Sequence, residues 1–283
     1  TVSRASLHNF DELQRKDIRV GDTVVVEKAG EIIPQVVAVR TDLRPAGASP
    51  IAPPAACPVC RSPAVRDPEG VYVRCINPTC PAQRKERLRY FAGRDQMDIE
   101  GLGSALIEQL VDSGLVTGPA DLYRLTAEQL KEKKDAGVLE RLGDKSIQNL
   151  IEAIAASKTR SLDRVLAALN IRHVGSHVAE LLAAAYGSMD AIVEAAGDVD
   201  RLQAIEGIGP VVARSISDFF TGEAGRRLVR ELREAGLTMK AERAAAPPAE
   251  RKLAGKTIVV TGTLRGFSRQ EIETLIKDLG GKA

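Results

Sequence analysis

The sequence predicts a mainly α-helical protein of several small domains, with β-structure chiefly towards its two ends. All four cysteines fall within residues 57–80, and a short glycine-containing pattern recurs four times between residues 99 and 213. Aromatic residues make up only 3% of the 283 residues, whereas hydrophobic residues make up 44%. Because aromatic side chains dominate large cores, this composition favours small helical units. A chain of this length has room for two or more domains.

The first forty residues are expected to alternate strands and turns. RVGDTVVVEKAGEIIPQVVAV contains an apolar strand at 23–26, a turn at 28–30 and a second strand at 32–39. One hairpin with a short opening strand is marginal alone, so we expect this end to belong to a larger β-domain. The following TDLRPAGASPIAPPAA, residues 41–56, has the composition of a linker. Residues 1–56 are therefore the first predicted domain, a partial β-barrel with its linker.

The cysteines are spaced as a metal site. They form C-x2-C, fourteen intervening residues, then C-x4-C. Two such turns, with Pro58, Asn77 and Pro78 as turn formers, complete the four-sulfur shell that Zn²⁺ accepts. Two disulfides are the alternative, disfavoured in a reducing compartment, and a redox C-x2-C pair lacks a βαβ setting. We predict a structural zinc module at residues 57–82, with these ligands: Cys57, Cys60, Cys75 and Cys80.

Basic charge is concentrated around these cysteines. The whole chain carries a formal net charge of only +2, but residues 57–94 hold eight Lys and Arg against three acidic residues. Such a cluster is expected of a surface that binds phosphate, but a solvent-exposed helix face explains it equally well. Charge alone does not distinguish the two interpretations. The basic residues are Arg61, Arg66, Arg74, Arg84, Lys85, Arg87, Arg89 and Arg94.

The region from residue 83 to residue 240 is predicted to be helical and repetitive. Its four repeat cores are IEGLGSALI (99–107), LERLGDKSI (139–147), IRHVGSHVA (171–179) and IEGIGPVVA (205–213). Each has an apolar residue, two variable positions, an apolar residue and a glycine, followed by a new helix. This is the pattern of a helix-hairpin-helix.

Glycines in such turns leave backbone N–H groups uncovered at the start of the second helix, where a DNA phosphate fits. The simpler alternative is that each glycine only closes the turn, and this applies most to the second and third repeats, where Arg141 and His173 stand in place of the first glycine. Four repeats in register favour phosphate contact that is independent of base sequence. The candidate DNA-binding residues are Gly101, Gly103, Gly143, Lys145, Arg172, Gly175, Gly207 and Gly209, with Arg214 as a further flanking cation.

The C-terminal end begins with a second predicted linker, AERAAAPPAERK at residues 241–252. Residues 253–283 then have the pattern strand, turn, helix and turn. A lone β–α unit cannot bury both of its apolar faces, so we expect this unit to be the start of a larger α/β domain.

In this order, the pieces resemble the C-terminal half of a bacterial NAD⁺-dependent DNA ligase. SRASLHNFDELQRKDIRVGDTVVVEKAGEIIPQVV is similar to the OB-fold of that family, and CPVC with CINPTCPAQ to its four-cysteine zinc finger. MDIEGLG resembles its first helix-hairpin-helix, and LAGKTIVVTGTL the opening of its BRCT domain. The resemblance covers essentially the whole chain.

The resemblance implies that the OB-fold lies against the DNA minor groove at a nick. The matching positions are Lys28, for a phosphate, and Ile32 and Ile33, for the groove floor and deoxyribose, with Arg4 and His8 as lesser candidates. Periodicity alone makes the isoleucines ordinary strand residues. The zinc finger is implied to bridge the OB-fold and the hairpins, which close around the duplex, and the BRCT domain is implied to be accessory.

The resemblance also implies that chemistry needs a further part of the enzyme. The catalytic lysine of the family lies in a K-x-D-G motif of an adenylation domain, which residues 1–283 do not contain; the nearest sequence is Lys133-Lys134-Asp135-Ala136. We expect the chain to be inactive alone, and the complete enzyme to use NAD⁺ with Mg²⁺ or Mn²⁺. A non-enzymatic DNA-repair scaffold is the alternative, and a phosphopeptide adaptor through the last β–α unit is a weaker one.

The expected partners are nicked double-stranded DNA and the N-terminal adenylation half of the same chain. No apolar run reaches transmembrane length and there is no charged-then-apolar leader. We therefore expect a monomer without membrane contact, in the bacterial cytoplasm at the nucleoid.

Overall fold

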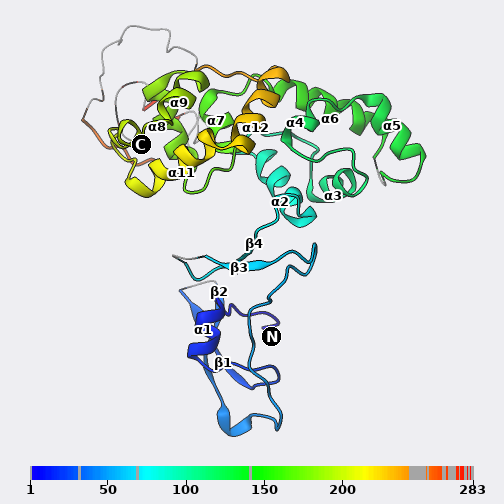
Figure 1. Cartoon of the computed structure of the whole chain (residues 1–283), viewed down its shortest axis with the longest axis vertical. Helices are drawn as coiled ribbons and strands as arrows, with labels where there is room; N and C mark the ends of the chain where they lie inside the picture. The colour runs from blue at the N-terminus through cyan, green and yellow to red at the C-terminus, as the bar shows by residue number, and fades with distance from the viewer. Residues whose placement is uncertain are drawn as a thin grey trace.

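The computed structural model describes residues 2–30, 33–67, 70–139 and 142–241, with short stretches between residues 253 and 281. Figure 1 shows a β-rich N-terminal part, a small two-stranded unit after it, and a large helical part. The elements of the first two parts are α1 (Phe10–Arg15), β1 (Val24–Ala29), β2 (Ile33–Val39), η1 (Thr41–Leu43), β3 (Ala64–Arg66) and β4 (Val73–Cys75).

The helical part contains the remaining elements that the structure describes. They are α2 (Pro81–Phe91), α3 (Ser104–Asp112), α4 (Pro119–Leu122), α5 (Ala127–Asp135), α6 (Asp144–Ser157), α7 (Leu162–Ala168), α8 (Ser176–Tyr186), α9 (Met189–Ala195), α10 (Val199–Gln203), α11 (Pro210–Thr221) and α12 (Glu223–Glu234). The predicted mainly helical, multidomain class is confirmed.

The N-terminal part is an antiparallel hairpin of β1 and β2 beside α1. Leu13, Ile18 and Val36 form its small core, and the opening segment adds one bridge, with Ser6 N donating to Pro34 O at 2.7 Å. The expectation of only strands and turns is wrong at residues 10–15. Helix α1 forms there because the Asn9 side chain caps it, accepting from Glu12 N at 2.9 Å.

Residues 41–56 are not a free linker. Arg44 donates to Asp22 Oδ1 at 2.8 Å and to Asp17 Oδ2 at 2.6 Å. Ile51 packs against the N-terminal core, and Arg19 bridges to Pro50. Composition predicted flexibility here, but these ion pairs and this apolar contact hold the segment against the hairpin.

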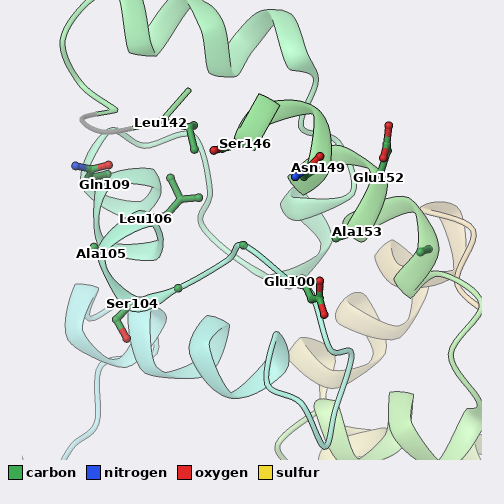
Figure 2. Close-up of a pocket in the computed structure, with 13 residues that line it drawn as sticks. Glu100, Ser104, Ala105, Leu106, Gln109, Leu142, Ser146, Asn149, Glu152 and Ala153 are labelled. Atoms are coloured by element: carbon green, nitrogen blue, oxygen red, sulfur yellow. The ribbon is translucent and has the colours of Figure 1, made fainter. Parts of the chain in front are cut away.

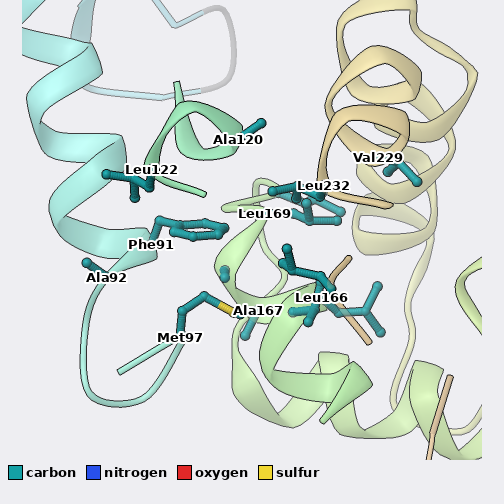
Figure 3. Packing of buried hydrophobic residues seen from close by; sticks show 14 of the residues in the cluster. Phe91, Ala92, Met97, Ala120, Leu122, Leu166, Ala167, Leu169, Val229 and Leu232 are labelled. Atoms are coloured by element: carbon teal, nitrogen blue, oxygen red, sulfur yellow. The ribbon is translucent and has the colours of Figure 1, made fainter. Parts of the chain in front are cut away.

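The helical part has one continuous core that joins segments far apart in the sequence. Figure 3 shows Phe91 of α2 and Leu122 of α4 facing Leu166 and Leu169 of the α7 region, with Leu232 of α12 beside them. All five are less than 9% exposed. Because α2 and α12 are packed into the same core, the hairpins between them are held as one unit.

The C-terminal end is described only in part. Thr257 takes part in a β-bridge, and the strand predicted within residues 253–283 stays a prediction, because much of this unit lies outside the described residues. Ile276 is 3% exposed, and Leu253 N donates to Leu279 O at 3.0 Å, so the unit folds onto itself. Apart from Ala241, the linker predicted at 241–252 lies outside the described residues. Among the described residues, no helix is long and apolar enough to cross a membrane.

Candidate metal centre and nucleic-acid interface

Two tight turns present the four cysteines. In the first, Arg61 N donates to Cys57 O at 3.0 Å while Arg61 has a φ of 61°. In the second, Cys80 N donates to Asn77 O at 3.2 Å, and the Asn77 side chain accepts from Thr79 N at 2.9 Å. The antiparallel pair β3–β4 sets Ala64 opposite Cys75 and so brings the turns together.

The sulfur positions fit a tetrahedral zinc ion. The four Sγ atoms all lie within 4.8 Å of one another, with Cys57 to Cys80 at 3.9 Å and Cys60 to Cys75 at 3.5 Å. Four sulfurs at about 2.3 Å from Zn²⁺ stand about 3.8 Å apart. All four are free thiols, so the disulfide alternative does not hold here. The four residues form a zinc-binding cluster of the structural type, because every position of the tetrahedron is filled by sulfur.

The thiols differ in acidity. Hydrogen bonds from the side chain and backbone of Ser62 lower the pKa of Cys60 to about 6. At Cys75 the backbone hydrogen bond of Asn77 lowers the pKa, but burial and the neighbouring thiols outweigh it and raise the value to about 12. Backbone hydrogen bonds of Cys60 and Val59 also lower the pKa of Cys57, so Cys57 and Cys60 ionise more readily than Cys75. Zinc, which binds thiolates, must displace the remaining thiol protons, so acid weakens binding.

The zinc module is fastened to both of its neighbours. Arg66 donates to both carboxylate oxygens of Asp11 in α1, at 2.9 and 2.7 Å. On the other side, Asp67 accepts from Arg172 of the third hairpin at 2.5 Å. Cys80 is also the N-cap of α2, so the helix starts directly from a zinc ligand. The module is thus a joint between the N-terminal part and the helical part (Figure 1).

A helix begins directly after the second glycine of each of the four repeats. The second glycine is the N-cap of α3, α6, α8 and α11, and its carbonyl accepts the first helical hydrogen bond at 2.9–3.0 Å in each case. In three of the turns the residue before that glycine donates to the carbonyl three residues earlier: Leu102 to Ile99, Val174 to Ile171, and Ile208 to Ile205.

The third turn is formed without its first glycine. His173 has a φ of 66° where Gly101 and Gly207 have 82° and 92°. A left-handed conformation is unusual for a residue with a Cβ, although histidine is among the types enriched in it. The turn keeps its shape, so the substitution does not remove the open helix start at Gly175. Arg141 of the second turn lies outside the described residues.

These helix starts are open to a ligand. Their N-cap residues are glycines, so the first N–H groups of each helix have no side-chain cap. In the described part of the chain, no atom lies within 4 Å of a methyl group built on Gly103, Gly175 or Gly209. Uncapped donors with free space in front of them form an anion site.

The hairpins pack in two pairs. A methyl group built on Gly101 in the first turn would lie 3.9 Å from Leu150 of α6, and one on Gly207 in the fourth turn 3.0 Å from Leu181 of α8. Between the first and second hairpins lies a hollow of about 1130 Å³. Figure 2 shows it bordered by Ser104 at one helix start and by Ser146 at the other. The pairing places two open helix starts beside one hollow.

We expect Gly207→Ala to destabilise the protein by about 1–2 kcal/mol, because Ala disfavours a left-handed φ and its methyl would meet Leu181. Gly209→Ala is the matched control, with a φ of −80° and open space. Urea unfolding compares the two. Equal destabilisation would contradict the assigned turn geometry.

The flanking cations differ in their surroundings. Lys145 and Arg214 are exposed, whereas the Arg172 guanidinium is held by Asp67. Sequence reasoning missed Asp67 as a partner, since 105 residues separate the two.

The N-terminal candidates lie around the β1–β2 hairpin. Lys28 is an exposed strand residue opposite Pro34, not a turn residue as the sequence predicted. Ile33 is 59% exposed and pairs with Ala29, the residue after Lys28. Its side chain therefore lies on the opposite face of the β1–β2 hairpin from that of Lys28. His8 contacts Gln35 Oε1 through Nε2 at 2.8 Å. Arg4 is exposed, and Ile32 lies outside the described residues.

Comparison with protein families agrees with this division into parts. Residues 1–48 match the NAD-dependent DNA ligase OB-fold domain, and residues 56–82 match the NAD-dependent DNA ligase C4 zinc finger domain. The chain belongs to the NAD-dependent DNA ligase family and corresponds to the C-terminal part of its members. Residues 164–229 match a helix-hairpin-helix motif, and residues 248–283 a BRCA1 C Terminus (BRCT) domain.

Curated relatives give the same family. The chain is 51% identical to the DNA ligase of Symbiobacterium thermophilum and 47% identical to that of Geobacter sulfurreducens, in both cases over its whole length. The DNA ligase of Lysinibacillus sphaericus is 44% identical over 99% of the chain. The chain spans only 41% of the length of each of these ligases. Since two of the matched domains are ligase-specific, the non-enzymatic scaffold is not favoured. The domain boundaries set out above stay predictions.

Proposed function

We propose that this chain is the DNA-clamping part of a ligase that seals single-strand nicks in duplex DNA during replication and repair. The observation that carries the proposal is the set of four helix starts whose N-caps are glycines. Each offers backbone N–H groups and the positive end of a helix to a phosphate. Phosphate contacts position a duplex without reading its bases, so binding is independent of sequence.

The other parts place the clamp at the nick. Lys28, Ile33, Arg4 and, by its place in the sequence, Ile32 are proposed to touch the duplex from the OB-fold. Because the zinc module is ion-paired to both neighbours, it is proposed to fix the angle between the OB-fold and the hairpins. Gly101 and Gly207 shape their turns, whereas Gly103, Gly143, Gly175 and Gly209 expose the donors.

The complete enzyme is proposed to take its adenylyl group from NAD⁺ and to use Mg²⁺ or Mn²⁺. A lysine nucleophile must be activated by its surroundings. The lysine at the motif position is Lys133, which lies on the charged helix α5 beside Lys134, and Ala136 stands where the motif has glycine. Residues 1–283 are therefore proposed to hold DNA without reacting with NAD⁺, as a monomer in the bacterial cytoplasm at the nucleoid.

Salt dependence tests the proposal. The chain is titrated with a nicked duplex in two unrelated base sequences at several salt concentrations. We expect the same affinity for both sequences, and a steep linear fall of log K with log salt, because each phosphate contact contributes about 0.9 to the slope. A clear preference for one sequence, or no salt dependence, would refute backbone clamping.

In the complete ligase, Lys28→Ala is expected to slow nick sealing more than formation of the enzyme–adenylate. The side chain is exposed on β1 and pairs with no described carboxylate, so it is available to a DNA phosphate. Single-turnover rates of the two steps measure the difference, with Lys133→Ala as a control on α5. If both steps slowed equally, Lys28 would not act through DNA.

A further inference from the structure

Helix α2 carries two groups of basic residues on different faces. Lys85 is paired with Asp112 at 2.8 Å, and Arg89 with Glu86 and, at 3.8 Å, with Glu108. Arg84 and Arg87 are one turn apart on another face. Neither lies within ion-pair distance of a carboxylate among the described residues. Half of the charge on this helix is thus neutralised within the protein and half is not.

The unneutralised face borders two adjoining hollows that share Arg87 and Asn170. One, of about 500 Å³, is also lined by Arg74 of the zinc module and Gln83. The other, of about 130 Å³, is also lined by Arg84. Glu86 reaches the first hollow but is held by Arg89. Arg87 donates to Pro78 O at 3.3 Å and to Gln83 Oε1 at 3.1 Å, and neither acceptor neutralises its charge. The groove therefore offers unneutralised guanidinium groups, with its one acidic side chain already paired.

The groove adjoins the proposed DNA surface. Asn170 belongs to the turn of the third hairpin, five residues before the open helix start at Gly175. Asp67, whose side chain is 7% exposed, lies 4.0 Å from Arg74 and holds Arg172 of the same turn. Arg74 also stacks over Tyr72, 5.0 Å from the ring centroid. These contacts fix the zinc module against the hairpin and hold the Arg74 guanidinium at the mouth of the groove.

The geometry points to a phosphate-binding groove formed by Arg74, Arg84 and Arg87 where the zinc module, α2 and the third hairpin meet. Its occupant is the backbone of the duplex held by the hairpins, so this inference rests on the proposed function. Arginine suits the site because its planar guanidinium matches two phosphate oxygens at once. The zinc finger is then part of the DNA-contacting surface as well as a joint.

A matched pair of double variants tests the groove in the complete, zinc-loaded ligase. R84Q/R87Q removes two cations from the groove, and K85Q/R89Q removes two from the other faces of the same helix. The readout is the slope of log K against log salt for a nicked duplex. We expect R84Q/R87Q to reduce the slope by about 1.8, at about 0.9 per lost phosphate contact, and K85Q/R89Q to leave it within about 0.5.

The outcomes separate the groove from the clamp. If the two variants had equal slopes of log K against log salt while wild-type binding stayed steeply salt-dependent, the groove would not bind phosphate. The proposal that the hairpins clamp the duplex would still stand. Absence of duplex binding by the wild type would overturn the proposed function itself. R84K/R87K keeps the charge but loses the guanidinium fork, and is expected to keep the slope while weakening affinity about tenfold. Zinc content and circular dichroism confirm that each variant is folded.

Discussion

Cys75→Ser is expected to abolish stoichiometric zinc binding and to unfold residues 57–80 while the helical domain stays folded. The reason is that the module has almost no core of its own. Val59, Val65, Tyr72 and Ile76 are 54%, 46%, 57% and 60% exposed. Zinc binding in such modules supplies about 10–16 kcal/mol, so the metal takes the place of a hydrophobic core. The helical domain keeps its separate core.

Elemental analysis and hydrogen exchange measure this result. The wild type should carry one zinc ion per chain, and the amides of β3 and β4 should lose protection in the variant. Loss of the module also removes the contacts of Arg66 and Arg172, so the N-terminal part should move freely relative to the hairpins. Val59→Ser is the control, because it introduces serine between two ligands without removing a sulfur. Full zinc occupancy in Cys75→Ser would contradict the four-cysteine site.

Gly103→Asp combined with Gly209→Asp is expected to abolish most duplex binding without unfolding the protein. Both glycines have φ near −80°, which any residue adopts. Aspartate is also a favourable N-cap, since its carboxylate accepts from the first N–H groups of the helix. The same carboxylate then occupies the phosphate position and repels the backbone. A charge-assisted contact is worth about 1.5–3 kcal/mol, so each site should cost about tenfold or more in affinity.

The corresponding alanine variants are the control. Alanine fits the open space at both positions and adds no charge, so Gly103→Ala with Gly209→Ala should bind within a few-fold of the wild type. Fluorescence anisotropy with a labelled nicked duplex gives the affinities, and thermal melting confirms the fold. Aspartate variants that are folded and bind normally would mean that the glycines only shape the turns.

Spacing in the sequence was sufficient to predict the features that depend on local geometry. The cysteine spacing predicted the sulfur cluster, and the repeat predicted the four helix starts, because each turn is determined by residues within nine positions. The absence of the first glycine in the third repeat was a misleading signal, because His173 adopts the left-handed conformation in its place. The buried side chains of Ile171 and Val174, each 4% exposed, hold this turn in place.

Features that depend on distant partners were not predictable from the sequence. The hydrogen bond of Arg172 to Asp67, 105 residues away, was not predicted, and the contact of Arg172 with DNA stays a prediction. The segment after β2 has the composition of a linker, yet Arg44 ties it to Asp17 and Asp22. Helix α1 was missed because the strand pattern around it dominated, although Asn9 followed three residues later by Glu12 is a recognisable N-cap signal.

The most direct test of the account compares the charge of the DNA backbone with the sequence of its bases. One nicked duplex has the phosphates on both sides of the nick replaced by neutral methylphosphonates, and a second keeps all phosphates but has a scrambled sequence. The account predicts that neutral linkages weaken binding by this chain at least tenfold, while scrambling leaves the affinity unchanged. Tight binding to the neutral duplex, or loss of binding on scrambling, would contradict it.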